Sequence, residues 1–258
     1  PSEAGTIPGL ANAGAISLGG SLLRQAFAPG CRSLTLMIIA ALLASLAFVW
    51  ARFVEHRLLS TTRITIEVNG LAPGLAGTRI VLLTDLHGAE FGQDQRTLAA
   101  TVRRENPDAI VFAGDLIDSN HDGLAAGLTM LAAMADIAPT YMVWGNHDYI
   151  AGVPELRAAI ADQAIAVTDL GDAWASRELA GGKLIFAGLA RSWRNGVTGL
   201  PALASTARAV HGDEPPLIAV IHSPGPKPVD DAVSAGADLV LAGHTHGGQI
   251  RLPFIGAL

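Results

Sequence analysis

The chain has 258 residues, of which 50% are hydrophobic and 16% are charged, and this balance excludes a disordered protein and a coiled coil. Its 17 basic and 23 acidic residues give a net charge of −6, so no broad basic surface is available to a nucleic acid and we expect no nucleic-acid partner. The single cysteine, Cys31, excludes an intramolecular disulfide and any metal site built from cysteines.

Residues 33–51 are the first predicted element, an apolar helix without a charged side chain. At 1.5 Å per residue it reaches roughly 28 Å, close to the ~30 Å hydrocarbon core of a bilayer. We interpret it as a single transmembrane helix or uncleaved signal anchor; a cleaved signal peptide and a buried core helix are the alternatives. Trp50 and the arginines on both sides favour a spanning helix. The Gly/Ala/Ser-rich residues 1–32 are predicted to be a flexible tail.

Beyond the apolar helix, we expect a juxtamembrane linker and a first strand in residues 52–77, and one domain in residues 78–258. Apolar runs alternate with amphipathic segments there, which predicts an α/β layered domain with largely buried sheets. The predicted strands are Arg63–Val68, Ile80–Thr84, Ala109–Phe112, Thr140–Val143, Leu184–Ala187, Leu217–Ile221 and Asp238–Leu241. The predicted helices are Arg96–Glu105, Gly123–Ala135, Pro154–Gln163 and Pro228–Ala235.

Polar clusters follow five of the apolar runs, at the strand ends where open α/β sheets place their ligands. Taken singly, each cluster has an ordinary explanation as a helix cap, a turn or a solvated histidine. Together they bring carboxylate, imidazole and amide donors to one sheet edge, as a divalent-metal site requires, without the thiolates of a closed structural zinc site. The clusters are TDLHG at 84–88, GDLID at 114–118, GNHD at 145–148, IHSP at 221–224 and GHTHGGQ at 243–249.

These motifs, in this order, resemble the calcineurin-like metallophosphoesterases over roughly residues 78–251. The surrounding segments ITIEVNGL, RIVLLTDLH and GHTHGGQIRLP look most like the bacterial membrane-anchored branch, some of whose members are phosphodiesterases or UDP-diacylglucosamine pyrophosphatases. The resemblance implies a four-layer αββα sandwich behind one transmembrane helix, single-pass in a bacterial cell membrane. It also implies further strands after the last motif, so the sequence to Leu258 is either a fragment or a minimal variant of the fold.

The resemblance further implies that seven of the polar side chains hold two divalent metal ions, Mn²⁺ being expected and Fe, Zn²⁺ and Mg²⁺ being alternatives. The implied ligands are Asp85, His87 and His246 for the first metal, Asn146, His222 and His244 for the second, and Asp115 for both. A hydroxide shared by the metals would attack the phosphorus atom. The implied catalytic residues are His147, which would donate to a phosphoryl oxygen or protonate the leaving group, and Asp148, which would orient the His147 ring.

The implied activity is hydrolysis of a phosphodiester or pyrophosphate bond in a small-molecule or lipid-linked substrate. A phosphomonoesterase and a catalytically silent scaffold are the alternatives, and the presence of all seven ligands and His147 disfavours the scaffold. A membrane-tethered nuclease is disfavoured by the net charge. The segment GLARSWRNG at 188–196 replaces an acidic pair common in the family, and its Arg191 and Arg194 either meet a second phosphate or are solvated.

Overall fold

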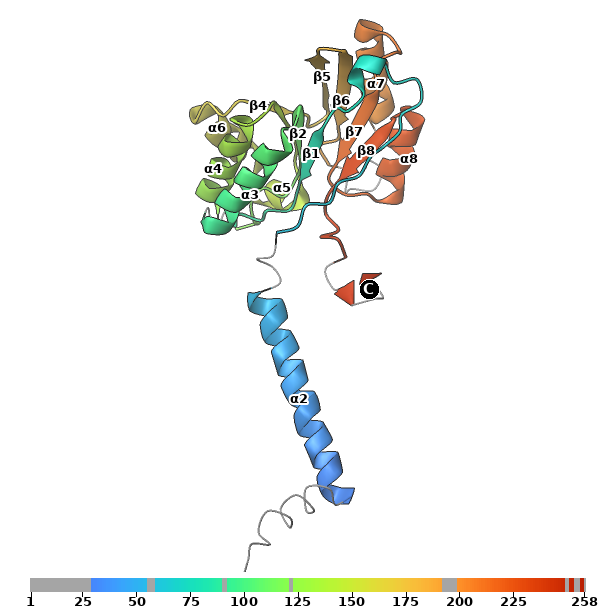
Figure 1. Cartoon of the computed structure of the whole chain (residues 1–258). Helices are drawn as coiled ribbons and strands as arrows, with labels where there is room; N and C mark the ends of the chain where they lie inside the picture. The colour runs from blue at the N-terminus through green and yellow to red at the C-terminus, as the bar shows by residue number, and fades with distance from the viewer. Residues whose placement is uncertain are drawn as a thin grey trace, which may run out of the picture. The chain divides into compact units, whose positions relative to one another are not determined.

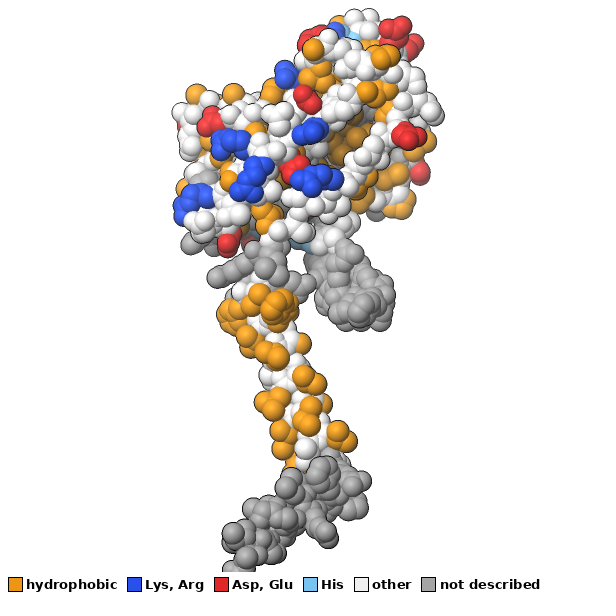
Figure 2. Space-filling view, viewed as in Figure 1, with side chains coloured by type: hydrophobic (Ala, Val, Ile, Leu, Met, Phe, Trp, Pro, Cys, Tyr) orange, Lys and Arg blue, Asp and Glu red, His pale blue; other side chains and the backbone are white. Residues whose placement is uncertain are grey.

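The computed structural model describes residues 29–54, 59–89, 92–120, 123–191, 199–248, 251–252 and 256–257, which fall into two compact units, residues 1–62 and 63–258. The first unit contains one long helix, α2 (Pro29–Phe53; Figure 1). Its segment Ser33–Ala51 is long and apolar enough to cross a membrane, and its large hydrophobic side chains are exposed (Figure 2). This exposure favours a spanning helix over the alternative of a buried core helix.

The second unit begins with a four-stranded parallel sheet in the order β1-β2-β3-β4. Its central strands β2 and β3 are buried along their whole length, as expected for strands covered on both faces. The strands are β1 (Ile80–Leu83), β2 (Ala109–Ala113), β3 (Thr140–Val143) and β4 (Val167–Asp169). The helices between them are α3 (Gln93–Glu105), α4 (Leu124–Ala135), α5 (Asn146–Ala151) and α6 (Val153–Asp162).

A second sheet has the order β5-β6-β7-β8, in which only the pair β5/β6 is antiparallel. Its strands are β5 (Ala173–Leu179), β6 (Gly182–Gly188), β7 (Leu217–Ile221) and β8 (Leu239–Ala242). Its helices are α7 (Leu200–His211) and α8 (Pro226–Ser234). The remaining described elements are the 3₁₀ turn η2 (Pro73–Leu75) and the short pair β9 (Arg251–Leu252) and β10 (Gly256–Ala257).

The two sheets pack face to face through an inner apolar cluster. Val111 and Tyr141 from the first sheet lie in this cluster with Phe186 and Val220 from the second. The Tyr141 and Phe186 rings are stacked with their centroids 4.5 Å apart. Helices α3 to α6 cover the outer face of the first sheet, and α7 and α8 cover that of the second (Figure 1). The αββα sandwich expected from the sequence is therefore confirmed.

Six of the seven predicted strands are present, and the predicted strand at Arg63–Val68 is wrong. Its alternating Ile64 and Ile66 have the period of a strand, but the segment pairs with no strand in the described chain and the two side chains are 77% and 47% exposed. An isolated run with β periodicity cannot form a ladder without a neighbour. The segment is held instead by the two hydrogen bonds between the Arg63 guanidinium and Glu105.

Asp231 of α8 caps the neighbouring helix α7, and its replacement should destabilise the second sheet's outer layer. The buried Asp231 carboxylate accepts the N–H groups of Gly199 and Leu200, at 2.9 and 3.0 Å, at the start of α7. Because Asp231→Ala leaves these donors unsatisfied, we expect it to lower the free energy of unfolding by about 1–3 kcal/mol. The control is Asp230→Ala at the exposed neighbour. Equal thermal stability of the two variants would contradict this cap.

Candidate metal centre

Six of the predicted metal ligands lie in the loops that follow β1, β2, β7 and β8, and Asn146 is the first residue of α5, just after β3. Several of them have unusual backbone conformations. Left-handed φ angles are uncommon for residues other than glycine, and they cluster where surrounding structure imposes them, often at functional sites. The candidate ligands with this conformation are Asp85 (55°), His87 (48°), Asp115 (54°), His244 (70°) and His246 (49°). The loops thus hold these side chains in place at some cost in backbone energy.

Gly114, with a φ of 93°, shows how closely these loops approach one another. A Cβ atom at this position would lie 2.6 Å from the Gly145 nitrogen and 2.6 Å from Nδ1 of His222. The glycine therefore lets the loops after β2 and β3 and the histidine after β7 come together from the two sheets.

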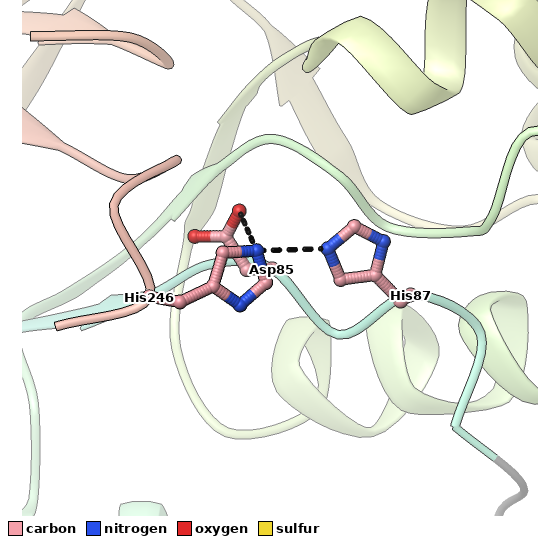
Figure 3. A group of neighbouring side chains, drawn as sticks. All are labelled: Asp85, His87 and His246. Atoms are coloured by element: carbon pink, nitrogen blue, oxygen red, sulfur yellow. Dashed lines mark hydrogen bonds and ion pairs between the residues drawn. The ribbon is translucent and has the colours of Figure 1, made fainter. Parts of the chain in front are cut away.

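Asp85, His87 and His246 form the first group of converging donors (Figure 3). Nε2 of His246 lies 3.2 Å from Nε2 of His87 and 3.6 Å from Oδ1 of Asp85. The other Asp85 oxygen, Oδ2, accepts hydrogen bonds from the Thr84 hydroxyl at 2.8 Å and the His244 N–H at 2.9 Å. Oδ1 is buried and has no hydrogen-bond donor among the described residues. A buried carboxylate oxygen without a donor is costly, and a cation between it and the two imidazoles would satisfy it.

The second group contains Asp115, His222 and His244, with Asn146 beside them. Nε2 of His222 lies 3.3 Å from Oδ2 of Asp115, 3.2 Å from Nδ1 of His244 and 3.0 Å from Oδ1 of Asn146. Nδ1 of His222 donates to the carbonyl oxygen of Ala113 at 2.8 Å. Since a carbonyl can only accept, Nδ1 carries a hydrogen, and Nε2 holds the lone pair when the ring is neutral. Burial lowers the pKa of His222, but the hydrogen bond and charge of Asp115 outweigh it, and the pKa is raised.

Asp115 belongs to the second group and also faces His87 of the first group. Its Oδ2 is 3.8 Å from Nε2 of His87 in the first group and 3.3 Å from Nε2 of His222 in the second. Its Oδ1 accepts the N–H of His147 at 2.9 Å. Burial alone would raise the pKa of this carboxyl, but the hydrogen bond and charge of His222 outweigh it, and the pKa is lowered. The side chain is thus a buried carboxylate facing both groups, where the sequence analysis expects a bridging ligand.

The surroundings of two candidate histidine ligands lower their pKa values. Burial lowers the pKa of His87, and the nearby His147 and His246 lower it further. Burial and the neighbouring His222 likewise lower the pKa of His244. A metal ligand must be a neutral imidazole, so these shifts favour metal binding over protonation.

His147 is oriented by Asp118, a residue to which the sequence analysis gives no role. Its Nδ1 lies 2.7 Å from Oδ1 of Asp118 and 2.9 Å from Oγ of Ser119. The His147 ring also meets the edge of His87 with centroids 4.6 Å apart, which places it beside the first group. The available signal was the second aspartate of the GDLID motif, three residues after Asp115.

The expected contact between Asp148 and the His147 ring is therefore wrong. Asp148 is fully buried, and its carboxylate accepts the N–H of Ile117 at 3.2 Å and that of Gly145 at 2.9 Å. Burial raises the pKa of Asp148 to about 6. These bonds tie the start of α5 to the loop after β2, so Asp148 fixes the backbone that carries Asn146 and His147.

All seven predicted ligands thus come together, and their chemistry fits divalent metals. They offer two carboxylates, four imidazoles and one amide without a thiolate, a set suited to Mn²⁺, Fe, Zn²⁺ or Mg²⁺. Of the two arginines in the segment 188–196, Arg191 is exposed, whereas Arg194 lies outside the described residues.

Several known proteins are similar to this chain in sequence or in structure. Over 223 residues the chain is 27% identical to the phosphodiesterase YaeI of Escherichia coli (strain K12), covering 80% of this chain and 71% of the relative. A transmembrane protein with a metallophosphoesterase domain from Danio rerio is 29% identical, but the match covers 72% of this chain and only 44% of that protein. A solved dimetal phosphatase from Danio rerio is 17% identical with a TM-score of 0.43, covering 70% of this chain and 85% of that one.

The family itself is shown by two further matches. The metallophosphoesterase YkuE of Bacillus subtilis (strain 168) is 30% identical over 226 residues, which cover 84% of this chain and 75% of the relative. Residues 78–248 match the family model of the calcineurin-like phosphoesterases, and this span contains all seven candidate ligands. The chain therefore belongs to the calcineurin-like phosphoesterase family, whose members are hydrolases that act on phosphoester bonds and use divalent metals.

Proposed function

We propose that this hydrolase cleaves a phosphodiester or pyrophosphate bond at a centre of two divalent metal ions. The observation that carries the proposal is the buried Asp115 carboxylate, whose Oδ2 faces His87 in one group of donors and His222 in the other. Asp85, His87 and His246 would hold the first metal, and Asn146, His222 and His244 the second. When bound, the two metals supply Lewis acidity at the phosphoryl oxygens and an activated water.

The chain's own residues would supply the remaining chemistry. Because Nδ1 of His147 donates to the Asp118 carboxylate, the opposite nitrogen, Nε2, would donate to a phosphoryl oxygen or to the leaving group from the imidazolium form of the ring. Asp148 would keep the α5 backbone, and with it His147, in register with Asp115.

A substrate panel tests this function. Detergent-solubilised protein with Mn²⁺ would be assayed on bis-p-nitrophenyl phosphate, p-nitrophenyl phosphate, cyclic nucleotides and UDP-diacylglucosamine, with a chelator as control. We expect hydrolysis of a diester or of the pyrophosphate, lost on chelation and restored by Mn²⁺. Fastest turnover of p-nitrophenyl phosphate would instead identify a phosphomonoesterase, and no turnover of any substrate would identify a silent scaffold.

We also propose that α2 anchors the protein once in a bacterial cell membrane and that the substrate is lipid-linked. Residues 54–62 are the whole tether between Phe53, the end of α2, and the second unit at Arg63. Nine extended residues reach about 30 Å, so a catalytic unit anchored by α2 would stay near the headgroups. The tether would raise the local concentration of lipid-linked substrates but not that of freely diffusing ones.

Removing the anchor should therefore affect only lipid substrates. Full-length protein and a truncated protein that begins at Thr61 would be compared on bis-p-nitrophenyl phosphate and on a lipid pyrophosphate in vesicles. We expect the truncated protein to keep its turnover of the soluble diester and to lose turnover of the lipid. An equal loss on both substrates, or no loss on either, would contradict the proposal.

A further inference from the structure

Arg191 lies three residues after the end of β6, the parallel neighbour of the strand β7 that precedes His222. Strands β6 and β7 are parallel neighbours (Figure 1), with Gly188 opposite Val220. The pairing continues past the strand end, because the Leu189 N–H donates to the Val220 carbonyl at 3.2 Å. The ladder therefore reaches Leu189, opposite Ile221, the residue directly before His222, and Arg191 follows two residues after Leu189.

The Arg191 side chain contacts α5, the helix that follows strand β3 of the first sheet. Its Cζ lies 4.7 Å from the centroid of the Tyr149 ring. Tyr149 is in α5, three residues after Asn146, and side chains with this spacing are neighbours on a helix surface. Arg191 thus follows β6 in the chain and contacts α5, the helix that carries the candidate ligand Asn146.

The charge of Arg191 is uncompensated in the described part of the chain, where it forms no ion pair with a carboxylate. The comparable Arg157 also lies over an aromatic ring, that of Trp144 at 5.8 Å, but its Nε donates to Asp169 at 2.6 Å. The exposed guanidinium also hydrogen-bonds to the Tyr149 side chain, and the geometry of its remaining N–H groups matches that of a phosphate.

We propose that Arg191 is a specificity-determining residue that binds a second phosphate of the substrate, next to the phosphate that reacts. This inference rests on the proposed hydrolase function and narrows its substrate to a phosphoanhydride, such as a nucleoside diphosphate linked to a further group. The phosphate that reacts would bind at the metal centre, and its neighbour would meet the guanidinium beside Tyr149. A diester with a single phosphate lacks the second phosphate that Arg191 would bind.

Kinetics on two soluble substrates test the inference. Wild-type protein, Arg191→Gln, Arg191→Lys and the matched control Arg157→Gln would be assayed with Mn²⁺ on bis-p-nitrophenyl phosphate and on UDP-glucose. We expect Arg191→Gln to lower kcat/KM for UDP-glucose roughly 10–100-fold, chiefly through KM, because charge-assisted hydrogen bonds are lost. Its activity on bis-p-nitrophenyl phosphate should stay within about twofold of wild type. Arg191→Lys should recover part of the loss, and Arg157→Gln should not discriminate between the substrates.

A binding measurement separates this inference from the proposed function. Calorimetry of Mn²⁺-loaded protein with ADP and AMP needs no turnover, and we expect Arg191→Gln to weaken binding of ADP roughly 10–100-fold while binding of AMP changes little. Unchanged affinity for ADP, or an equal loss for both nucleotides, would overturn the role of Arg191. If wild-type protein hydrolyses neither substrate, the proposed function fails. The affinities of wild type and Arg191→Gln for ADP and for AMP still decide the role of Arg191.

Discussion

Asp115→Asn should abolish turnover and lower the number of bound metals. The substitution keeps the size of the side chain. It removes the negative charge that lies beside His87 of the first donor group and His222 of the second. Bound metals contribute several kcal/mol of transition-state stabilisation, so at about 1.4 kcal/mol per tenfold change we expect kcat to fall by at least about 10³-fold. Elemental analysis and kcat on bis-p-nitrophenyl phosphate, measured on the same samples, would check this result.

The control for Asp115 is Asp136→Asn, which removes the same charge from an exposed position just after α4. It should keep wild-type metal content and activity. Wild-type protein that binds no more than one activating metal at saturating Mn²⁺ would contradict the proposed two-metal centre. So would an Asp115→Asn variant that retains two metals and full turnover.

Substitutions at two neighbouring residues of α5 should separate chemistry from metal binding. His147→Ala is expected to keep both metals and lose roughly 10²–10⁴ in kcat, the range for a general acid, because Nδ1 of this ring is held by Asp118 rather than directed at a metal. Asn146→Ala removes an oxygen that lies 3.0 Å from Nε2 of His222, so it should weaken the second metal. Metal titrations and kcat at saturating metal would measure the two effects.

Asp118→Asn extends this test to the residue that orients His147. Loss of a supporting carboxylate of this kind costs about 10–100-fold, so the variant should lie between wild type and His147→Ala with its metal content unchanged. A His147→Ala variant that loses metal but keeps its turnover per bound metal would show that His147 is a ligand. In that case the catalytic role of His147 would be wrong.

Much of the fold was predictable because the buried strands have a strong sequence signal. AIVFA in β2 and LIAVI in β7 are continuous apolar runs, as expected of strands covered on both faces, and the structure gives both the predicted position. Strand β5 was missed because its residues AWASREL are only partly buried and mix polar with apolar side chains. The apparent strand at Arg63–Val68 failed for the opposite reason, since periodicity reports a suitable side-chain pattern and not the presence of a partner strand.

The candidate site was predictable as a set of residues but not as a set of contacts. The order of the motifs brought all seven candidate ligands to the strand ends, where the structure places them. Sequence adjacency suggested that Asp148 orients its neighbour His147, yet successive residues of a helix point in different directions. Asp118 reaches the ring from another loop, and this contact depends on how the loops after β2 and β3 pack together.

The division of the donors between the two sheets has a mechanical consequence. Asp85, His87, Asp115 and Asn146 follow strands of the first sheet, while His222, His244 and His246 follow strands of the second. A cation held by both sets would act as a cross-link between the halves of the sandwich, at an edge beyond the apolar contact of Tyr141 with Phe186. Because it would bind the folded protein and not the unfolded chain, the melting temperature would rise with metal concentration, and the halves would separate together rather than one at a time.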